Sequence, residues 1–177
     1  MRLMRTRRQF VAGLGSALAL PVAAQFRIEI AGVGATQLPI AIAAFRGEVG
    51  APASVSAIVR ADLERSGLFR SVDAPPNLDE RSALPQAELR GRGADALLAG
   101  SMMRLADGTF DIRYKLWDAV RGSEHFARAT TVVAADLRLA AHRIADEIYE
   151  NLTGERGVFA TRIAYVTKAG RNFTLRI

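Results

Sequence analysis

The sequence predicts an α/β (α+β) fold, in which a mixed β-sheet is packed with two to three helices and is followed by a short truncated β-hairpin. Strand-like segments alternate with segments of helical periodicity in the first half of the chain. The turn sequence Asp107-Gly108 lies between two strand-like segments in the second half. Hydrophobic residues make up 50% and charged residues 24% of the 177 residues, as is ordinary for one folded domain with appendages.

Two strands and a helix are expected first. Phe26–Ile30 alternates apolar and charged residues and predicts a half-exposed strand. Because Gly32 and Gly34 follow it, this strand either pairs as the first strand of the domain or is lent to a partner by strand addition. Pro39–Phe45 is a continuous apolar run, typical of a strand buried on both faces. Ala53–Ser66 carries apolar residues at helical spacing and predicts a helix.

Residues 68–93 are expected to form a short return to the sheet, a loop and a second helix. Leu68-Phe69 leads back toward the sheet after the helix ends at Gly67. Asp73–Asn77 predicts a loop, because adjacent prolines suit neither a helix nor a central strand. Pro85–Gly93 predicts a second, weaker helix, in which proline is accepted in the first turn.

A three-strand meander and a final helix complete the expected domain. Ala94–Leu105 and Thr109–Asp118 flank the Asp107-Gly108 turn and predict a hairpin. Glu124–Val133 predicts a third antiparallel strand. Asp136–Leu152 has one apolar face and predicts the last helix, with Asp136 as its N-cap.

Residues 1–24 have the pattern of a signal peptide. A basic segment, Met1–Arg8, precedes the apolar run Phe10–Leu20, and small residues then permit cleavage between Ala24 and Gln25. The apolar run is too short to span a bilayer, so we expect no direct membrane insertion. Thr6–Val11 resembles a twin-arginine export motif, and the general secretion route stays open. Four arginines of this segment account for most of the formal charge of +6, so no nucleic-acid partner is expected.

Few residues in the chain are suited to catalysis or metal binding. The chain has no cysteine and two histidines, His125 and His142, without a nucleophile-elbow motif. His142 and Asp146 share a face of the last helix, but no third ligand marks a metal site. We expect that face to be solvated, like the acidic pairs Asp79-Glu80 and Asp146-Glu147. The sequence predicts no catalytic residue, no metal and no cofactor; a small periplasmic hydrolase that uses either histidine is an alternative.

The segment LTGERGVFATRIAYV, residues 152–166, marks a boundary. Gly154 is placed to end the last helix in a left-handed conformation, and Glu155, Arg156 and Gly157 form a basic, turn-prone bridge. Arg162–Val166 and Phe173–Ile177 predict two strands joined by a turn at residues 169–172. Two strands alone are marginal in water, so a continuation is expected.

This segment closely resembles the junction between the N-terminal α/β domain and the first β-propeller blade of the TolB family, the periplasmic component of the Tol-Pal system of Gram-negative bacteria. The resemblance implies four parts: signal peptide 1–24, α/β domain 25–153, interdomain linker 154–161, and first propeller strands 162–177, with the rest of the propeller missing. It also implies a non-enzymatic periplasmic component that supports outer-membrane integrity and envelope invagination at cell division through protein contacts.

The resemblance further implies two partners. The mature N-terminal segment would bind the C-terminal domain of TolA, through Phe26, Arg27, Ile28, Glu29 and Ile30. Pal is expected to bind only when the propeller is present.

Four junction residues are candidates for an interdomain contact that couples the propeller to the N-terminal segment: Arg156, Phe159, Thr161 and Arg162. The alternative is a linker with incidental charge. For the chain as a whole, the alternative is a free-standing periplasmic accessory domain that regulates an envelope enzyme or outer-membrane assembly.

Overall fold

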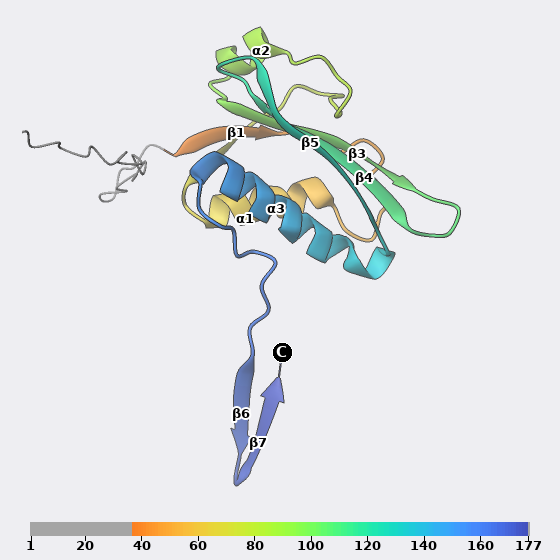
Figure 1. Ribbon diagram of the computed structural model, residues 1–177, viewed down its shortest axis with the longest axis vertical. Helices are drawn as coiled ribbons and strands as arrows, with labels where there is room; N and C mark the ends of the chain where they lie inside the picture. The colour runs from red at the N-terminus through yellow and green to blue at the C-terminus, as the bar shows by residue number, and fades with distance from the viewer. Residues whose placement is uncertain (1–36, 177) are drawn as a thin grey trace, which may run out of the picture. The chain divides into compact units, whose positions relative to one another are not determined.

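The computed structural model describes residues 37–176. The signal peptide, its cleavage point at Ala24 and Gln25, and the expected strand Phe26–Ile30 lie outside these residues. The described part contains a mixed five-stranded sheet with helices on both faces, which confirms the predicted fold class (Figure 1).

The sheet has the strand order β2-β1-β3-β4-β5. Its first three strands are parallel, with β1 paired to β2 on one side and to β3 on the other. The remaining pairs, β3 with β4 and β4 with β5, form the predicted antiparallel meander. The strands are β1 (Leu38–Ile42), β2 (Phe69–Val72), β3 (Ala96–Arg104), β4 (Phe110–Asp118) and β5 (Ser123–Val132).

Helices α1 (Val55–Arg65) and α2 (Gln86–Gly91) connect the parallel strands. The chain moves from β1 to β2 in one direction and then back past β1 to β3, and right-handed crossovers therefore place the two helices on opposite faces. Helix α3 (Leu137–Thr153) packs beside α1 on the same face of the sheet (Figure 1).

Two apolar clusters fill the two faces of the sheet. The larger lies between the sheet and helices α1 and α3, and includes Ile40, Leu98 and Ile144. The smaller lies against α2 and the preceding loop, and includes Leu97 and Trp117. Residues on alternate positions of β3 thus enter different clusters, because successive side chains of a strand point to opposite faces.

The first turn of α1 is held by two side chains. Ser54 is the N-cap and accepts a hydrogen bond from the Ala57 backbone N–H at 3.3 Å. The buried Glu48 carboxylate accepts bonds from the backbone N–H groups of Phe45 and Ser56, each at 3.1 Å, and from the Ser56 hydroxyl. A carboxylate at this end of the helix also complements the helix dipole.

Helix α3 begins and ends close to the predicted positions. Gly154 ends it in the left-handed conformation, with φ of 76°, as predicted. Asp136 occupies the N-cap position, but its side chain makes no capping hydrogen bond, so the predicted capping role is wrong. The short 3-10 turn Ala134–Asp136 leads into the helix and holds Asp136 at a φ of −98° and ψ of 1°, away from the extended conformation that capping side chains prefer.

A buried tyrosine fastens α3 to the meander. The Tyr114 hydroxyl donates to one Glu147 carboxylate oxygen at 2.6 Å, and Arg128 Nε donates to the other at 2.7 Å. Burial and the bond to Glu147 raise the pKa of Tyr114 far above its ordinary value. Strands β4 and β5 are therefore held to the helix through one carboxylate.

The expectation that Asp79 is solvated is wrong. Asp79 is buried, with 5% of its surface exposed, in the loop before α2. Its carboxylate accepts bonds from the Arg81 backbone N–H and the Ser82 hydroxyl, both at 2.9 Å, and pairs with Arg46 at 2.5 Å. These local bonds allow a charged side chain to be buried where its sequence neighbours are polar.

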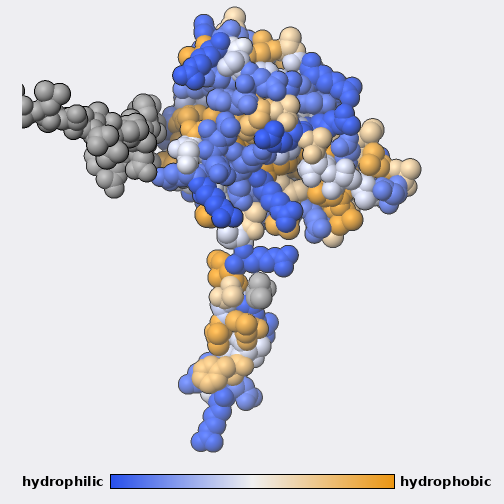
Figure 2. Space-filling model, in the orientation of Figure 1, coloured by the Kyte–Doolittle hydropathy of each residue, from blue (hydrophilic) through white to orange (hydrophobic). Residues whose placement is uncertain are grey.

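The C-terminal hairpin forms a two-stranded sheet of its own. Strand β6 (Tyr165–Ala169) begins three residues later than predicted and pairs with β7 (Asn172–Arg176). Every residue of both strands is exposed. Figure 2 shows apolar side chains along this hairpin, and the exposed large ones are Tyr165, Val166, Phe173 and Leu175.

Asp79→Asn should make stability less sensitive to acid. Burial by itself would raise the pKa of Asp79, but the bonds from Arg81 and Ser82 and the Arg46 cation outweigh it and hold the pKa below its ordinary value of 3.8. A depressed pKa adds stability above the unfolded value, and this contribution is lost as the pH falls through the folded value.

We expect the variant to be less stable by about 1–3 kcal/mol at neutral pH, and the difference to shrink below about pH 4. Urea unfolding over a pH series measures this, with the exposed Glu64→Gln on α1 as control. A difference that stayed constant down to strongly acidic pH would contradict the assignment.

Candidate functional site

The junction after α3 is docked on the helix rather than detached from it. The Asp146 carboxylate accepts the backbone N–H of Phe159 at 2.6 Å and that of Ala160 at 3.0 Å. One acidic side chain on α3 therefore holds two consecutive peptide groups of the junction. Hydrogen bonds to a charged acceptor are each worth about 1.5–3 kcal/mol.

Gly157 allows this close approach. A Cβ atom at this position would lie 2.4 Å from Asp146 Cα and 2.6 Å from Asp146 Oδ1. The contact with Cα cannot be relieved by moving the far end of a side chain, because Cα belongs to the helix backbone. The junction can therefore lie against α3 only with glycine here.

The Phe159 ring continues the contact. It packs edge-on against Tyr149 of α3, with ring centroids 5.6 Å apart and planes at 82°. Tyr149 in turn packs against Phe69 at the start of β2, at 6.0 Å. Burial, together with the negative charge of Glu155, raises the pKa of Tyr149. The three rings connect the junction to the edge of the main core.

The four predicted contact residues are therefore placed differently from one another. Phe159 is half-buried and packs against the core of its own domain. Arg156 and Arg162 are exposed. Thr161 is also exposed and donates through its hydroxyl to the Val158 carbonyl at 2.7 Å. Whether these residues contact a second domain stays a prediction, and so does the division of the chain at residue 154.

Sequence reasoning missed Asp146, Tyr149 and Gly157 as parts of the junction. It placed Asp146 on a solvated helix face, which is wrong because Asp146 is half-buried by the segment it binds. A glycine directly before the apolar residues Val158 and Phe159 was the available signal for a close approach between backbones.

His142 is not solvated either. Its Nδ1 lies 2.5 Å from a carboxylate oxygen of Asp62 on α1, and Arg65 Nη1 lies 2.9 Å from the other oxygen. Asp62 is buried, with 2% of its surface exposed, and the pair joins α1 to α3. The other histidine, His125, is exposed on β5, as expected. His125 therefore lies on the surface, and His142 lies at the interface between α1 and α3.

Residues 37–176 contain no helix long and apolar enough to cross a membrane. They also contain no group of three or more histidine, aspartate or glutamate side chains arranged to hold a metal ion. The predicted protein-binding residues Phe26, Arg27, Ile28, Glu29 and Ile30 lie outside the described part of the chain.

Comparisons with known proteins relate this chain to one family. The family model described as the TolB amino-terminal domain matches residues 26–125. The Tol-Pal system protein TolB of Polaromonas sp. strain JS666 is 55% identical over 95% of this chain. The protein of the same name from Albidiferax ferrireducens is 57% identical over 88% of this chain. The chain spans 40% and 37% of the lengths of these relatives.

A solved structure agrees with the sequence comparisons. The crystal structure of TolB from Acinetobacter baumannii superposes with a TM-score of 0.62 and 32% sequence identity. The match covers 79% of this chain and 35% of that protein. The mixed sheet and its helices therefore belong to a fold already seen in a related protein.

Asp146→Ala should release the junction from α3. We expect hydrogen exchange at the Phe159 and Ala160 amides to accelerate by about tenfold to a hundredfold, because both amides lose a charged acceptor. Gly157→Ala should have a similar effect through its clash with the Asp146 backbone.

Glu150→Ala, at an exposed position of α3, is the matched control and should leave these amides unchanged. Amide exchange resolved by NMR is the measurement. Unchanged protection of Phe159 in both junction variants would show that the docked junction is not formed in solution.

Proposed function

The chain belongs to the TolB amino-terminal domain family, and we propose that it acts as a non-enzymatic, protein-binding component of the Tol-Pal system in the periplasm. In this role it supports outer-membrane integrity and envelope invagination at cell division. The observation that carries the proposal is the match to Tol-Pal system proteins named TolB over 95% of this chain. The fold agrees with it, through the TolB structure from Acinetobacter baumannii.

Export through a cleaved signal peptide is part of the proposal. The basic segment, the apolar run and the small residues before Gln25 support it. The twin-arginine-like motif Thr6–Val11 favours that route without removing the general one.

We further propose that the mature N-terminal segment binds the C-terminal domain of TolA. Phe26, Ile28 and Ile30 alternate with Arg27 and Glu29, so an extended segment presents its apolar side chains on one face. This pattern suits addition of a strand to a partner's sheet, where backbone hydrogen bonds give affinity and side chains give register.

Pal is proposed to bind through a propeller of which β6 and β7 are the first strands. The exposed apolar residues of this hairpin, among them Val166, Phe173 and Leu175, support a neighbouring strand layer. In the register of the hairpin, Val166 faces Leu175 and Lys168 faces Phe173, so these side chains share one face. The chain by itself should therefore bind Pal weakly or not at all.

The docked junction offers a structural basis for the proposed coupling between the propeller and the N-terminal segment. Asp146 and the row of rings Phe159, Tyr149 and Phe69 hold the second half of the linker on the domain. The exposed Arg156, Thr161 and Arg162 remain available to a following domain. A propeller that favours either the docked or the released junction would change the domain's arrangement, as coupling between sites requires.

The affinity of residues 25–177 for the periplasmic C-terminal domain of TolA tests the proposal. We expect binding by calorimetry, and its loss in a chain that starts at Gly34. Ile28→Glu should weaken binding by about tenfold or more, because a charge replaces a central apolar contact.

Ile163→Glu, at an exposed apolar position before β6, is the control and should bind normally. Equal affinity of the full and shortened chains would remove the N-terminal segment from the interface. A micromolar complex of residues 25–177 with Pal would contradict the assignment of Pal binding to the propeller.

A further inference from the structure

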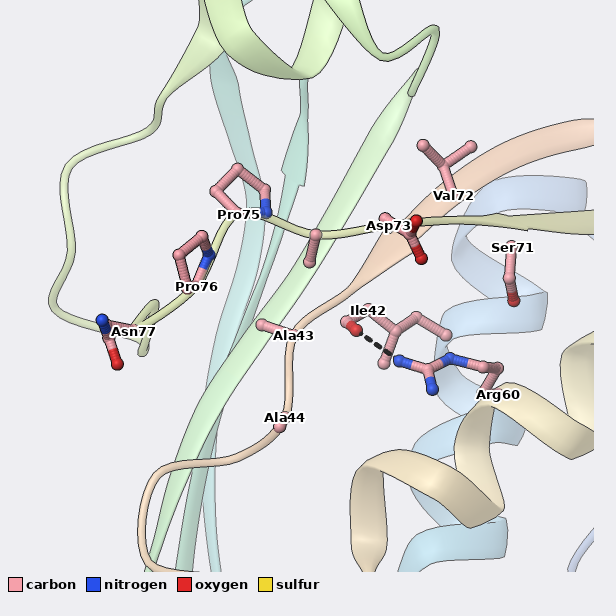
Figure 3. Close-up of a pocket in the computed structure, with 11 residues that line it drawn as sticks. Ile42, Ala43, Ala44, Arg60, Ser71, Val72, Asp73, Pro75, Pro76 and Asn77 are labelled. Atoms are coloured by element: carbon pink, nitrogen blue, oxygen red, sulfur yellow. Dashed lines mark hydrogen bonds between the residues drawn. The ribbon is translucent and has the colours of Figure 1, made fainter.

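A cavity of about 500 Å³ lies at the carboxyl ends of the parallel strands β1 and β2 (Figure 3). Its walls come from the end of β1 and the residues after it, from the end of β2 and its following loop, and from Arg60 of α1. In open sheets with parallel strands, ligands bind in the crevice outside the carboxyl ends of the strands. The volume is in the range of small-molecule sites.

Arg60 brings a positive charge to this cavity. Its Nη2 donates to the Ile42 carbonyl at 2.7 Å, which fixes the guanidinium at the end of β1 (Figure 3). Within residues 37–176 it has no other hydrogen-bond acceptor and no ion-pair partner. A guanidinium carries several N–H donors in a fixed fork, so Arg60 is held in place with donors to spare.

Ser71 and Asp73 face the same space from β2 and the residue after it. They are two residues apart, so their side chains share a side of the strand, and Figure 3 shows both on the side where Arg60 lies. The Ser71 hydroxyl is buried and has no hydrogen-bond partner in the described part of the chain. Because this atom is closed off from solvent, a ligand in the cavity meets the charged groups of Arg60 and Asp73 rather than this hydroxyl.

Arg60 and Asp73 carry opposite charges and line one cavity, yet they do not pair with each other in residues 37–176. A site with one positive and one negative group is complementary to a ligand that carries one charge of each sign. An anion alone would leave the Asp73 carboxylate opposing it, and a cation alone would oppose Arg60.

The remaining wall is apolar and stiff. Pro75 and Pro76 line it, and prolines restrict the backbone before ligand arrives. Asn77 is the non-glycine residue with positive φ, 59°, in the described chain, and it lies at this cavity. Backbone held in such a conformation is found preferentially at binding sites, and a rigid wall lowers the entropy lost on binding.

We propose that this cavity binds a small zwitterion, an α-amino acid with an apolar side chain. Its carboxylate lies on the Arg60 guanidinium, its ammonium lies on Asp73, and its side chain lies on the proline wall. Arginine is suited to the carboxylate because its fork matches the two oxygens.

Titration of the isotope-labelled full chain with L-leucine, followed by NMR, tests the proposal. Backbone amides of Ala43, Ala44, Val72 and Asp73 should shift and saturate in the millimolar range. Leucinamide lacks the carboxylate, N-acetyl-leucine lacks the ammonium and glycine lacks the apolar side chain, and each should bind about tenfold more weakly or worse.

Arg60→Gln and Asp73→Asn should each weaken leucine binding by about tenfold or more. Arg70→Gln is the matched control, since Arg70 is an exposed arginine on the opposite face of β2. Asp73 is exposed, so its variant tests the site even if loss of the Arg60–Ile42 bond disturbs folding. Shifts that do not saturate, or equal effects of the Arg60 and Arg70 variants, would overturn the proposal.

Discussion

The position of β1 between two parallel neighbours is the constraint on which the rest of the structure depends. A central parallel strand must bury both faces, and the apolar run from Pro39 to Phe45 meets that requirement. The chain passes first to one side of β1 and then to the other. The two connecting helices, α1 and α2, therefore lie on opposite faces of the sheet. The parallel pairing of β1 with β2 brings their carboxyl ends together beside α1, where the cavity lies.

Helix α3 fastens the layers to one another through its polar residues. His142 reaches α1 through Asp62, Glu147 reaches β4 and β5 through Tyr114 and Arg128, and Asp146 reaches the junction. Each link uses a charged group, and hydrogen bonds to charged groups contribute more than those between neutral ones. The helix thus joins the core, the meander and the junction, while its apolar stripe fills the main cluster.

The docked junction links fold and proposed function. A linker that were merely solvated would let the following strands turn independently of the domain. Asp146, Gly157 and the ring of Phe159 instead hold residues 157–160 of the linker against one surface of α3. Phe159 packs against Tyr149, and Tyr149 packs against Phe69 at the start of β2. This is a short physical path from the following strands to the edge of the sheet.

The sequence by itself determined the kinds of element and their order, because periodicity and turn chemistry act over a few residues. The apolar run of β1, the hairpin around Gly108 and the end of α3 at Gly154 were all readable in this way. The tertiary structure alone decided which polar residues are buried. Asp62 and His142 are 80 positions apart, and Asp79 and Asp146 each precede a glutamate in sequence, a pattern typical of a solvated surface. Whether such a carboxylate meets water or a hydrogen-bond donor depends on what the fold places opposite it, and local sequence carries no record of that.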